Sequence, residues 1–574
     1  MTGKKKKSSL HTRWQTLPAG LRTAAGWLFG WGVCCAAAVL AVYYWRVFYS
    51  YDRFPALWLT AAAVGVVSVL YFSVRCVLRF VPTLAGKAAL LLVLAGLGFC
   101  FGDPPMQVPD EQGHFLREYA ISMGRFDFDA ERSYPGDVTL LVRDFPGAYT
   151  NGNDGAALKQ YCHLADENDP NGLKLPDGPV LSVSDCFAAY RADVAAWRQT
   201  GVEPEDPVKE PLVVMLIPYL VGALGMAAVR TLGGGALACL YAGRVCGLLR
   251  YALLAYLALR GQKRWRGAFL SVLFLPLALF MAGSLNYDAI LLGLYAVAAS
   301  LLLREEFGKK QMTGFVICVA LINTIKPWIN LLWIPGLLFL DKKNRRTRLG
   351  PWGSMAVTLA ASLAATALTS GYGRLARHNY GVVARMLGGT VSTLDQLKFC
   401  LANPLRTAAV LWGTLFENEF FLSGFGDFGA LDTHIPVVAW CSVLLLALGV
   451  IHDVSEKPLS VRTNLGLGLF GAVYTVGVMA AMYLTYTPVG MVRVIGLQAR
   501  YFLPALGCGM VLLAQVIGNT LRRSGHVLER RASAAAERSP MLLTGFAVGA
   551  LGALLLFVTY FIGPVTWTVI TLPV

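Results

Sequence analysis

A short stretch of sequence, PDEQGHFLREY at residues 109–119, combines side-chain types that can do acid–base chemistry. Asp110 and Glu111 form an acidic pair, and His114 and Arg117 follow within two helical turns. In a helix, Asp110, His114 and Arg117 project from one face. A carboxylate there can take a proton from a hydroxyl group, and a neighbouring cation can hold an anionic leaving group. A solvated amphipathic helix with an acidic first turn fits the same spacing, so spacing alone leaves both interpretations open.

Two further ionisable residues lie among apolar neighbours. Asp288 occurs in SLNYDAI, residues 284–290, and Lys326 occurs in IKPWIN. An ionisable side chain near membrane depth is a functional candidate. The alternatives are a helix cap at Asn286 or Asp288 and a lysine that reaches the lipid headgroups with its ammonium group.

Two arginines, Arg493 and Arg500, lie seven residues apart in VRVIGLQARYFLPA. Guanidinium groups bind phosphate through paired hydrogen bonds, so this pair suits a lipid phosphate or pyrophosphate. The alternative is an anchor to lipid headgroups, helped by Tyr501 and Phe502.

The composition of the chain places these candidates in a membrane protein. Of 574 residues, 56% are hydrophobic and only 15% are charged, and the mean hydropathy is +0.55. About 20 apolar residues are needed for a helix to cross roughly 30 Å of hydrocarbon. The sequence therefore predicts an all-α polytopic membrane protein with about thirteen spans. The expected spans are 26–47, 55–74, 84–101, 236–259, 267–283, 288–304, 312–325, 328–340, 351–370, 435–452, 463–486, 500–519 and 541–562.

The charge distribution predicts the orientation of the chain. Residues 102–210 hold 20 Asp and Glu against 9 Lys and Arg, although the whole chain has a net charge of +16. The positive charge therefore lies in short loops between apolar segments, as on a cytoplasmic face that contacts anionic lipids. This pattern predicts a multi-pass protein of the cell membrane with a cytoplasmic N-terminus and no nucleic-acid partner.

The apolar segment at residues 211–230 is expected to be an interfacial helix that does not cross the membrane. If it crossed, the basic loops at 261–267, 341–348 and 521–538 would face the same side as the acidic loop. With this helix at the interface, all basic loops share the side of the N-terminus. The candidates Asp110, Asp288, Lys326, Arg493 and Arg500 then share the opposite, extracytoplasmic side.

The same argument gives the expected domain organisation. Residues 1–80 hold a basic cytoplasmic N-terminus and two additional spans, residues 81–520 form the core, and residues 521–574 hold a basic loop and the last span. Within the core, large extracytoplasmic loops are expected at 102–210 and 371–434.

The cysteines and acidic residues leave two questions open. Cys162 and Cys186 lie in the expected extracytoplasmic loop and can pair there if the fold brings them together. Asp110, Glu111 and Asp288 can together hold Mg²⁺ or Mn²⁺, although no ligand spacing demands a metal ion.

Taken in order, several motifs resemble the bacterial membrane-protein family known as domain of unknown function 2142. The resemblance covers about residues 100–520 and is most specific in PDExxHF and QARYFLP. It is carried by PDEQGHFLREYAISMGRF, PLALFMAGSLNYDAILL, KPWINLLWIPGLL, GFGDFGALDTHIP and GLQARYFLPAL. Ala499 stands where glycine is expected, and the GWLD stretch of the family corresponds here to GDFGALD.

That family is similar in turn to the GT-C superfamily, whose members transfer sugars from polyprenol phosphates. The resemblance implies a first acidic motif at Asp110 and Glu111, an interfacial helix at 211–230 and a second acidic residue at Asp288. It implies an inverting transfer from a polyprenyl-phosphate-linked sugar to a hydroxyl group of an envelope glycan, lipid or protein. Asp110 is then the base, with Glu111, Asp288 or a divalent cation in support.

The remaining candidates are expected to bind substrate. Lys326 and Arg500 would hold the leaving phosphate, and His114, Arg117 and Arg493 would contribute to the same site. A transporter or flippase of lipid-linked saccharides, or a non-catalytic protein of envelope assembly, is the alternative to an enzyme.

Overall fold

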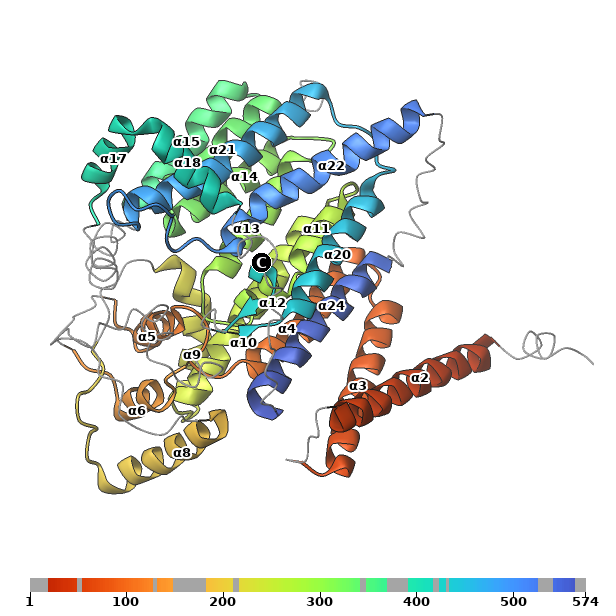
Figure 1. Ribbon diagram of the computed structural model, residues 1–574, viewed down its shortest axis with the longest axis vertical. Helices are drawn as coiled ribbons and strands as arrows, with labels where there is room; N and C mark the ends of the chain where they lie inside the picture. Colours follow the sequence, from red (N-terminus) through yellow and green to blue (C-terminus); the bar gives the residue numbers. More distant parts are fainter. Residues whose placement is uncertain are drawn as a thin grey trace, which may run out of the picture. The chain divides into compact units, whose positions relative to one another are not determined.

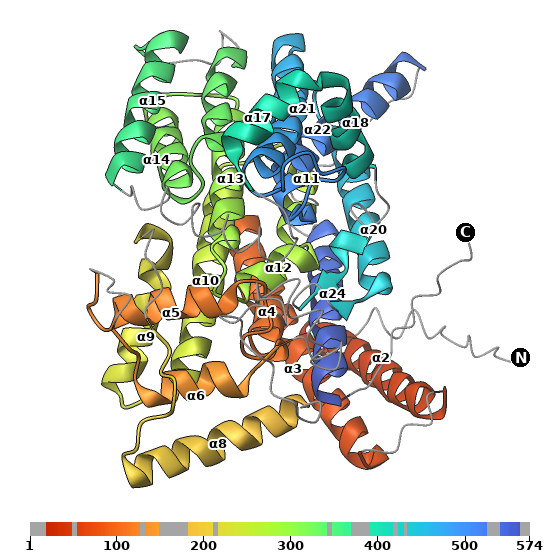
Figure 2. The same cartoon turned by 60° about the vertical axis from the view of Figure 1, so that its left-hand side comes forward.

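The computed structural model describes most of the chain (Figures 1 and 2). Contacts divide the chain into two compact units, residues 1–82 and 83–574. The described residues are 19–48, 54–126, 132–147, 182–209, 216–340, 347–368, 391–416, 423–429, 433–524 and 540–562.

The first unit is a pair of long apolar helices, α2 (Ala19–Phe48) and α3 (Ala56–Phe80). The indole of Trp31 donates a hydrogen bond to the Ser68 hydroxyl at 2.8 Å, which joins the two helices. Both helices are long and apolar enough to span a membrane. They correspond to the first two expected spans.

The second unit is mostly helical and contains six further helices that are long and apolar enough to span. They are α4 (Leu84–Gly102), α10 (Ala236–Arg260), α20 (Pro436–Asp453), α21 (Val461–Thr485), η6 with α22 (Ala499–Phe502 and Leu503–Arg523), and α24 with η7 (Pro540–Phe557 and Val558–Ile562). Among the described residues, this makes eight candidate spans in the whole chain. The polytopic, helical class is therefore confirmed, whereas the count of thirteen is not.

The other five expected spans are not among these candidates: four form helices that are short or interrupted, and the fifth, α15 (Pro351–Leu368), has 18 residues. The four are α11 with α12 (Arg266–Leu273 and Pro276–Ala282), α13 (Asp288–Leu302), α14 (Lys309–Ile325) and the 3₁₀ helix η3 (Ile329–Phe339). The break between α11 and α12 has a local cause in Pro276, which has no backbone N–H and forces the preceding residue into an extended conformation. Leu275 accordingly has φ −54° and ψ 133°.

The acidic loop folds into helices that lie against the bundle. It contains α5 (Glu111–Ser122), α6 (Gly136–Asp144) and α8 (Val183–Thr200), and α5 packs on α9 (Leu220–Thr231). Figure 2 shows these four helices together at the lower left. Phe115, Tyr119 and Val138 are buried at their common core. This arrangement places residues 111–119 of the motif on a helix, with Asp110 as the N-cap residue before it.

The expected interfacial helix is present as η2 (Ile217–Tyr219) followed by α9. Its 15 residues extend for roughly 22 Å at 1.5 Å per residue, less than the hydrocarbon thickness. Its position at the membrane surface stays a prediction. Residues 210–215 lie outside the described residues, as does Cys162, so the pairing of Cys162 with Cys186 also stays a prediction.

The second expected loop, 371–434, also contains regular structure. Its described part has α17 (Thr393–Ala402), α18 (Pro404–Leu415) and η5 (Ser423–Phe425), followed by strands β1 (Asp427–Phe428) and β2 (Thr433–His434). The two strands pair antiparallel. Phe428 is fully buried against Phe99 and Phe280, so this loop is anchored on α4 and α12.

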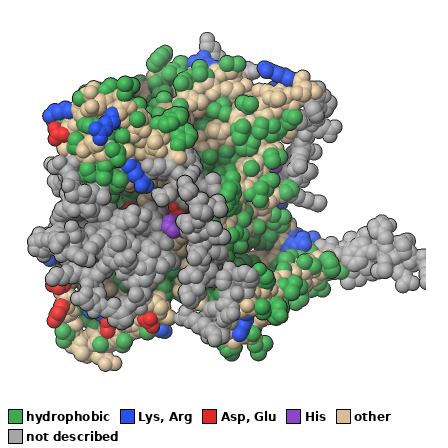
Figure 3. Space-filling model, in the orientation of Figure 1, with side chains coloured by type: hydrophobic (Ala, Val, Ile, Leu, Met, Phe, Trp, Pro, Cys, Tyr) green, Lys and Arg blue, Asp and Glu red, His purple; other side chains and the backbone are tan. Residues whose placement is uncertain are grey.

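The described surface agrees with this organisation. Figure 3 shows hydrophobic side chains over much of the visible bundle, while acidic side chains gather at the lower left, where Figure 1 places α6 and α8. The acidic residues of the first loop are thus separated from the apolar sides of the long helices.

Candidate functional site

Asp288 lies at the centre of a buried charged cluster formed by three helix ends. Its Oδ1 is 2.6 Å from Nζ of Lys326, and its Oδ2 is 2.6 Å from Nε of Arg500. Asp288 and Arg500 are buried, and Lys326 retains some exposure. Two cations facing one carboxylate leave the cluster with one net positive charge, which suits an anionic ligand.

Each member of the cluster is positioned by the end of a helix. Asp288 is the first residue of α13, and its backbone N–H donates to Oδ1 of Asn286 at 2.9 Å. The helix N-terminus favours a negative side chain there. Asn286 thus satisfies one free amide at the start of α13, although Tyr287 is the N-cap residue, and the Asp288 carboxylate is directed to the cations.

Lys326 ends α14 at a sharp turn. Pro327 follows it, and the amide of Ile329 donates to the Pro327 carbonyl across Trp328 at 3.0 Å. Trp328 has φ 71°, in a region that a non-glycine residue adopts at a cost of about 1–3 kcal/mol. Such strain is common at functional sites, and here it directs the chain away immediately after Lys326.

Aromatic rings surround the two cations. Nζ of Lys326 lies 4.4 Å from the ring centroid of Tyr501 and 5.4 Å from that of Tyr287. The guanidinium carbon of Arg500 lies 5.3 Å from the Tyr501 ring. Cation–π attraction of this kind keeps positive charge in a partly dry site.

His114 lies beside this cluster on α5. Its Nδ1 is 2.9 Å from the Tyr219 hydroxyl, and its ring meets that of Tyr287 edge-on at 4.9 Å. Burial, followed by the positive charge of Arg117, lowers the pKa of His114 from 6.5 to about 3. His114 is thus neutral at physiological pH. The charges of Asp110, Asp288 and Arg500 also act on this imidazole, so the structure brings these predicted residues together.

Asp110 precedes α5 in a left-handed conformation with φ 61°. Its side chain is exposed and, within the described residues, caps no amide of α5. An exposed carboxylate next to buried cations is accessible to a substrate hydroxyl group.

Glu111 faces inward, away from this exposed position. Both of its oxygens accept hydrogen bonds from Arg244, at 2.8 Å from Nε and 2.6 Å from Nη2. Arg244 also donates to the carbonyl oxygens of Cys100, Asp103 and Pro104. All five guanidinium N–H groups are therefore used, and the turn between α4 and α5 is fixed to α10.

Glu118 is a second buried carboxylate on α5. It lies against Gly222 of α9 and Gly243 of α10, where a Cβ atom would meet its carboxyl group at 2.1 Å and 2.9 Å. Burial raises the pKa of Glu118 to about 8, against the opposing charge of Arg250. The carboxyl group is therefore largely protonated at neutral pH, and the two glycines allow α5 to approach the bundle closely.

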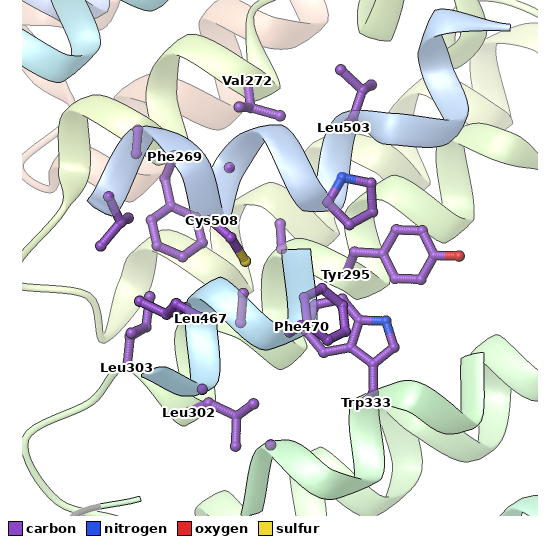
Figure 4. A pocket seen from close by; sticks show the side chains of 18 of the residues that line it. Phe269, Val272, Tyr295, Leu302, Leu303, Trp333, Leu467, Phe470, Leu503 and Cys508 are labelled. Carbon is purple, nitrogen blue, oxygen red and sulfur yellow. The ribbon is translucent and has the colours of Figure 1, made fainter. Parts of the chain in front are cut away.

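An apolar cleft runs alongside α13 (Figure 4). It contains about 980 Å³ of empty space, including its open mouth. In Figure 4, Leu503, Tyr295 and Trp333 line its right-hand side, and Leu302, Leu303 and Leu467 line its left-hand side. Tyr295 is seven residues after Asp288, about 10 Å along a helix, so the cleft begins close to the cations.

A hydrogen-bonded chain links the cleft to the cluster. The Tyr295 hydroxyl donates to Oδ1 of Asn330 at 2.8 Å, and Nδ2 of Asn330 donates to the Lys326 carbonyl at 2.7 Å. The ring of Trp333 stacks on Tyr295 with centroids 5.5 Å apart. The aromatic end of the cleft and the position of Lys326 are thus parts of one rigid unit.

Comparison with known families identifies the group to which this architecture belongs. Residues 187–508 match the model of a family described as "Predicted membrane protein (DUF2142)". The chain belongs to this family. The membership expected from the motifs is confirmed, although the match is narrower than residues 100–520 and begins after Asp110. No curated protein and no solved structure matches the chain.

Residues 187–508, which match the family model, contain much of the candidate site. Asp288, Lys326 and Arg500 lie within this range, together with the residues that line the apolar cleft, except Val511. Arg493 also lies within it, but its side chain is exposed on the loop before Arg500.

The three carboxylates do not fit a metal ion in this arrangement. Both oxygens of Glu111 face Arg244, and those of Asp288 face Lys326 and Arg500. Within the described parts of the chain, no group of three His, Cys, Asp or Glu side chains is suited to hold a metal ion. Cationic side chains occupy the positions that a divalent cation would take.

Sequence analysis missed Arg244, although the chain contained a signal for it. This arginine lies in ALACLYAGRVCGLL, the first part of the apolar helix Ala236–Arg260, which is long enough to span a membrane. An ionisable residue within such a segment normally has a specific partner. The partner, Glu111, is 133 positions away in the chain, and local spacing cannot reveal such a pair.

Proposed function

We propose that this protein is a membrane glycosyltransferase that moves a sugar from a polyprenyl phosphate to a hydroxyl acceptor. The main support is the apolar cleft that begins close to Lys326 and Arg500. A lipid phosphate needs both features, because its phosphate requires cations and its chain requires an apolar channel. The resemblance to the GT-C superfamily favours the same donor.

The reaction assigns a role to each part of the cluster. Asp110 takes the proton of the acceptor hydroxyl as its oxygen attacks the anomeric carbon. The bond between that carbon and the phosphate oxygen breaks with inversion, and the phosphate leaves with the bonding electrons. Lys326 and Arg500 stabilise the charge that develops on the leaving oxygen.

The other predicted residues support this chemistry. Asp288 holds the two cations in place before the donor arrives, and Glu111 fixes the backbone beside Asp110 through Arg244. His114 and Arg117 border the site as neutral and positive groups that contact the sugar, and Arg493 attracts the anionic donor from the loop. The proposal routes no step through a metal ion.

The proposed setting is the extracytoplasmic face of the cell membrane, with the N-terminus in the cytoplasm. Nucleotide sugars are absent from that side, so a lipid-linked donor suits it. The acceptor is a hydroxyl group of an envelope glycan, lipid or protein. Analysis of lipids from a deletion strain identifies the donor, because the unused polyprenyl-phosphate sugar accumulates.

Reconstitution tests the proposal directly. Purified protein in proteoliposomes is given a radiolabelled polyprenyl-phosphate sugar and an envelope extract as acceptor. A labelled product that is lost in Asp110→Asn, at a rate reduced about 10²–10⁴-fold, supports base catalysis. Asparagine also adopts left-handed backbone readily, so the fold is kept. Transfer by Asp110→Asn at the original rate contradicts the assignment.

The same vesicles separate the two other classes of function. Donor that crosses the bilayer unchanged indicates a flippase. A non-catalytic role in envelope assembly predicts neither event, and a strain with Asp110→Ala and Asp288→Ala then keeps the phenotype of the parent strain.

A further inference from the structure

Helices α17 and α18 have two different faces. Together they extend over residues 393–415 and meet at Asn403, whose backbone N–H donates to the Phe399 carbonyl and ends α17. Pro404 then begins α18 with a fixed φ. At 10 and 12 residues the helices extend for only about 15 and 18 Å, so neither crosses a bilayer.

The inner face of this hairpin binds the backbone of the loop at residues 486–498. Oε1 of Gln396 accepts a hydrogen bond from the Gly490 N–H at 2.9 Å, and Gln396 is fully buried. Oγ1 of Thr414 accepts from the Val494 N–H at 3.1 Å. Val410 packs with Val494 in the same contact. This loop leads directly into η6, which carries Arg500.

The outer face carries large apolar side chains with little cover. Leu405 is 86% exposed and Trp412 is 68% exposed. They share this face with four more residues, Leu394, Leu397, Leu401 and Phe416. A continuous apolar patch of this kind marks an interaction surface.

Several observations identify the partner of this face as lipid. α17 packs on α21, a candidate span whose own exposed residues, such as Leu465, Leu469 and Val473, form an apolar stripe. Lys398 and Arg406 are also exposed on the hairpin. Tryptophan, leucine and basic residues on a short helix are typical of the boundary between lipid headgroups and acyl chains.

We infer that helices α17 and α18 form an interfacial hairpin, which rests on the bilayer through its outer face and holds the Arg500 loop through its inner face. The hairpin thereby fixes the height of Arg500 relative to the lipid headgroups. This inference stands independently of the proposed glycosyl transfer, because it concerns only the membrane and the loop.

Fluorescence quenching in liposomes tests the membrane contact. A fluorescent non-natural amino acid replaces Leu405 or Trp412 in the full chain, and brominated phospholipids or aqueous iodide serve as quenchers. Position 473 on α21 is the bilayer control, and position 205, exposed in the acidic loop, is the aqueous control. We expect quenching at 405 and 412 by lipids brominated near the glycerol, with deeper bromines effective only at 473.

Two outcomes overturn the inference. Iodide quenching at 405 and 412 equal to that at 205 shows a face that points into water. Resistance to both quenchers shows a face covered by protein.

Hydrogen exchange tests whether the hairpin binds the backbone of the loop at residues 486–498. Thr414→Val keeps the shape of the side chain but removes the hydroxyl oxygen that accepts the hydrogen bond from the Val494 N–H. Exchange at this amide should become about fivefold faster, as expected for one hydrogen bond. Thr407→Val, on the same helix, removes a hydroxyl that bonds only within the hairpin at Asn403, and should leave that amide unchanged. Equal exchange in Thr414→Val and the parent protein contradicts the role of the inner face.

Discussion

Glu111 and Arg244 form a fully buried ion pair that joins the first turn of α5 to α10, with Nη2 and Oε2 only 2.6 Å apart. The pair lies directly beside Asp110 in the chain. The exposed and the buried members of the acidic pair therefore have different tasks. Asp110 is exposed, whereas Glu111 fixes the backbone from which Asp110 projects.

Loss of the Arg244 guanidinium group should destabilise the fold strongly. Arg244→Met keeps an unbranched apolar chain in place of the arginine stem but leaves the Glu111 carboxylate and three carbonyl groups without their donor. Removing one partner of a buried pair costs about 3–5 kcal/mol. We expect a much lower midpoint of thermal unfolding in detergent. Arg191→Met on the exposed side of α8 is the control and should change stability by less than about 0.5 kcal/mol.

The variant Glu111→Gln distinguishes a positioning role of Glu111 from a catalytic role. A positioning role predicts that unfolding midpoint and sugar transfer fall together, and that the double variant with Arg244→Met regains part of the stability. A catalytic role for Glu111 predicts the opposite result, in which transfer is lost while the unfolding midpoint of the single variant stays at the parent value.

Replacement of either cation near Asp288 should weaken the use of the lipid donor. Charge-assisted hydrogen bonds contribute about 1.5–3 kcal/mol each, so Lys326→Met or Arg500→Gln should lower kcat/KM for the donor about 10–100-fold. Lys398→Met removes an exposed lysine that pairs with Asp395 at 3.2 Å. This control should leave kcat/KM for the donor unchanged. A loss equal to that in Lys326→Met and Arg500→Gln would indicate that positive side chains attract the anionic donor in general and form no specific phosphate site.

The buried imidazole of His114 should make the fold sensitive to acid. Its pKa falls from 6.5 to about 3 on folding, so between these values the unfolded chain holds the extra proton. Stability therefore decreases as pH falls through this window, by up to about 1.4 kcal/mol per pH unit. His114→Gln should flatten the dependence of the unfolding midpoint on pH. Tyr219→Phe keeps the imidazole and should keep the pH dependence of the unfolding midpoint. If His114→Gln showed the same pH dependence as the parent protein, another titrating group would be responsible for it.

Removal of divalent cations should leave sugar transfer intact. The oxygens of Glu111 and Asp288 already face Arg244, Lys326 and Arg500. We expect the rate in proteoliposomes to change by less than about twofold with a chelator present, compared with added Mg²⁺ or Mn²⁺. A rate that disappears with the chelator and returns with one of these ions would require a different arrangement of the carboxylates.

Part of this fold could be predicted from apolar length and loop charge. The eight long helices match expected spans because a bilayer imposes a strong length requirement on each one. The interruption at Pro276 and the 3₁₀ form of η3 were not predicted, since hydropathy records how apolar a segment is and not how its backbone is hydrogen-bonded. The helices α17 and α18 were missed because their apolar runs are too short to register as spans.

Part of the site could be predicted from residue type. Asp288 and Lys326 were selected because ionisable residues are costly among apolar neighbours, and Arg500 because a guanidinium group binds phosphate. The structure brings all three together. The functions of Asp110 and Glu111 could not be separated in the sequence, because their difference depends on Arg244 in another helix. The apolar cleft was also missed, since it arises between helices distant in the chain.

Filling the cleft should block long lipid donors while sparing the charged cluster. Gly507 lines the cleft, and a Cβ atom there would meet nothing within 4 Å. Gly507→Leu therefore fills empty space without displacing a neighbour. We expect the KM for a long-chain donor to rise about tenfold, which corresponds to about 1.4 kcal/mol of lost binding, with little change for a water-soluble short-chain analogue.

Gly509→Leu is the matched control for this experiment. Gly509 lies on the same helix and is exposed, with nothing within 4 Å of a Cβ atom. It does not line the cleft, so the substitution has the same effect on helix propensity without reaching the proposed lipid site. The KM for the long donor should stay at the parent value. Of the two introduced side chains, only the one at position 507 projects into the cleft. Equal KM values for both variants and the parent protein would therefore show that the donor chain binds elsewhere.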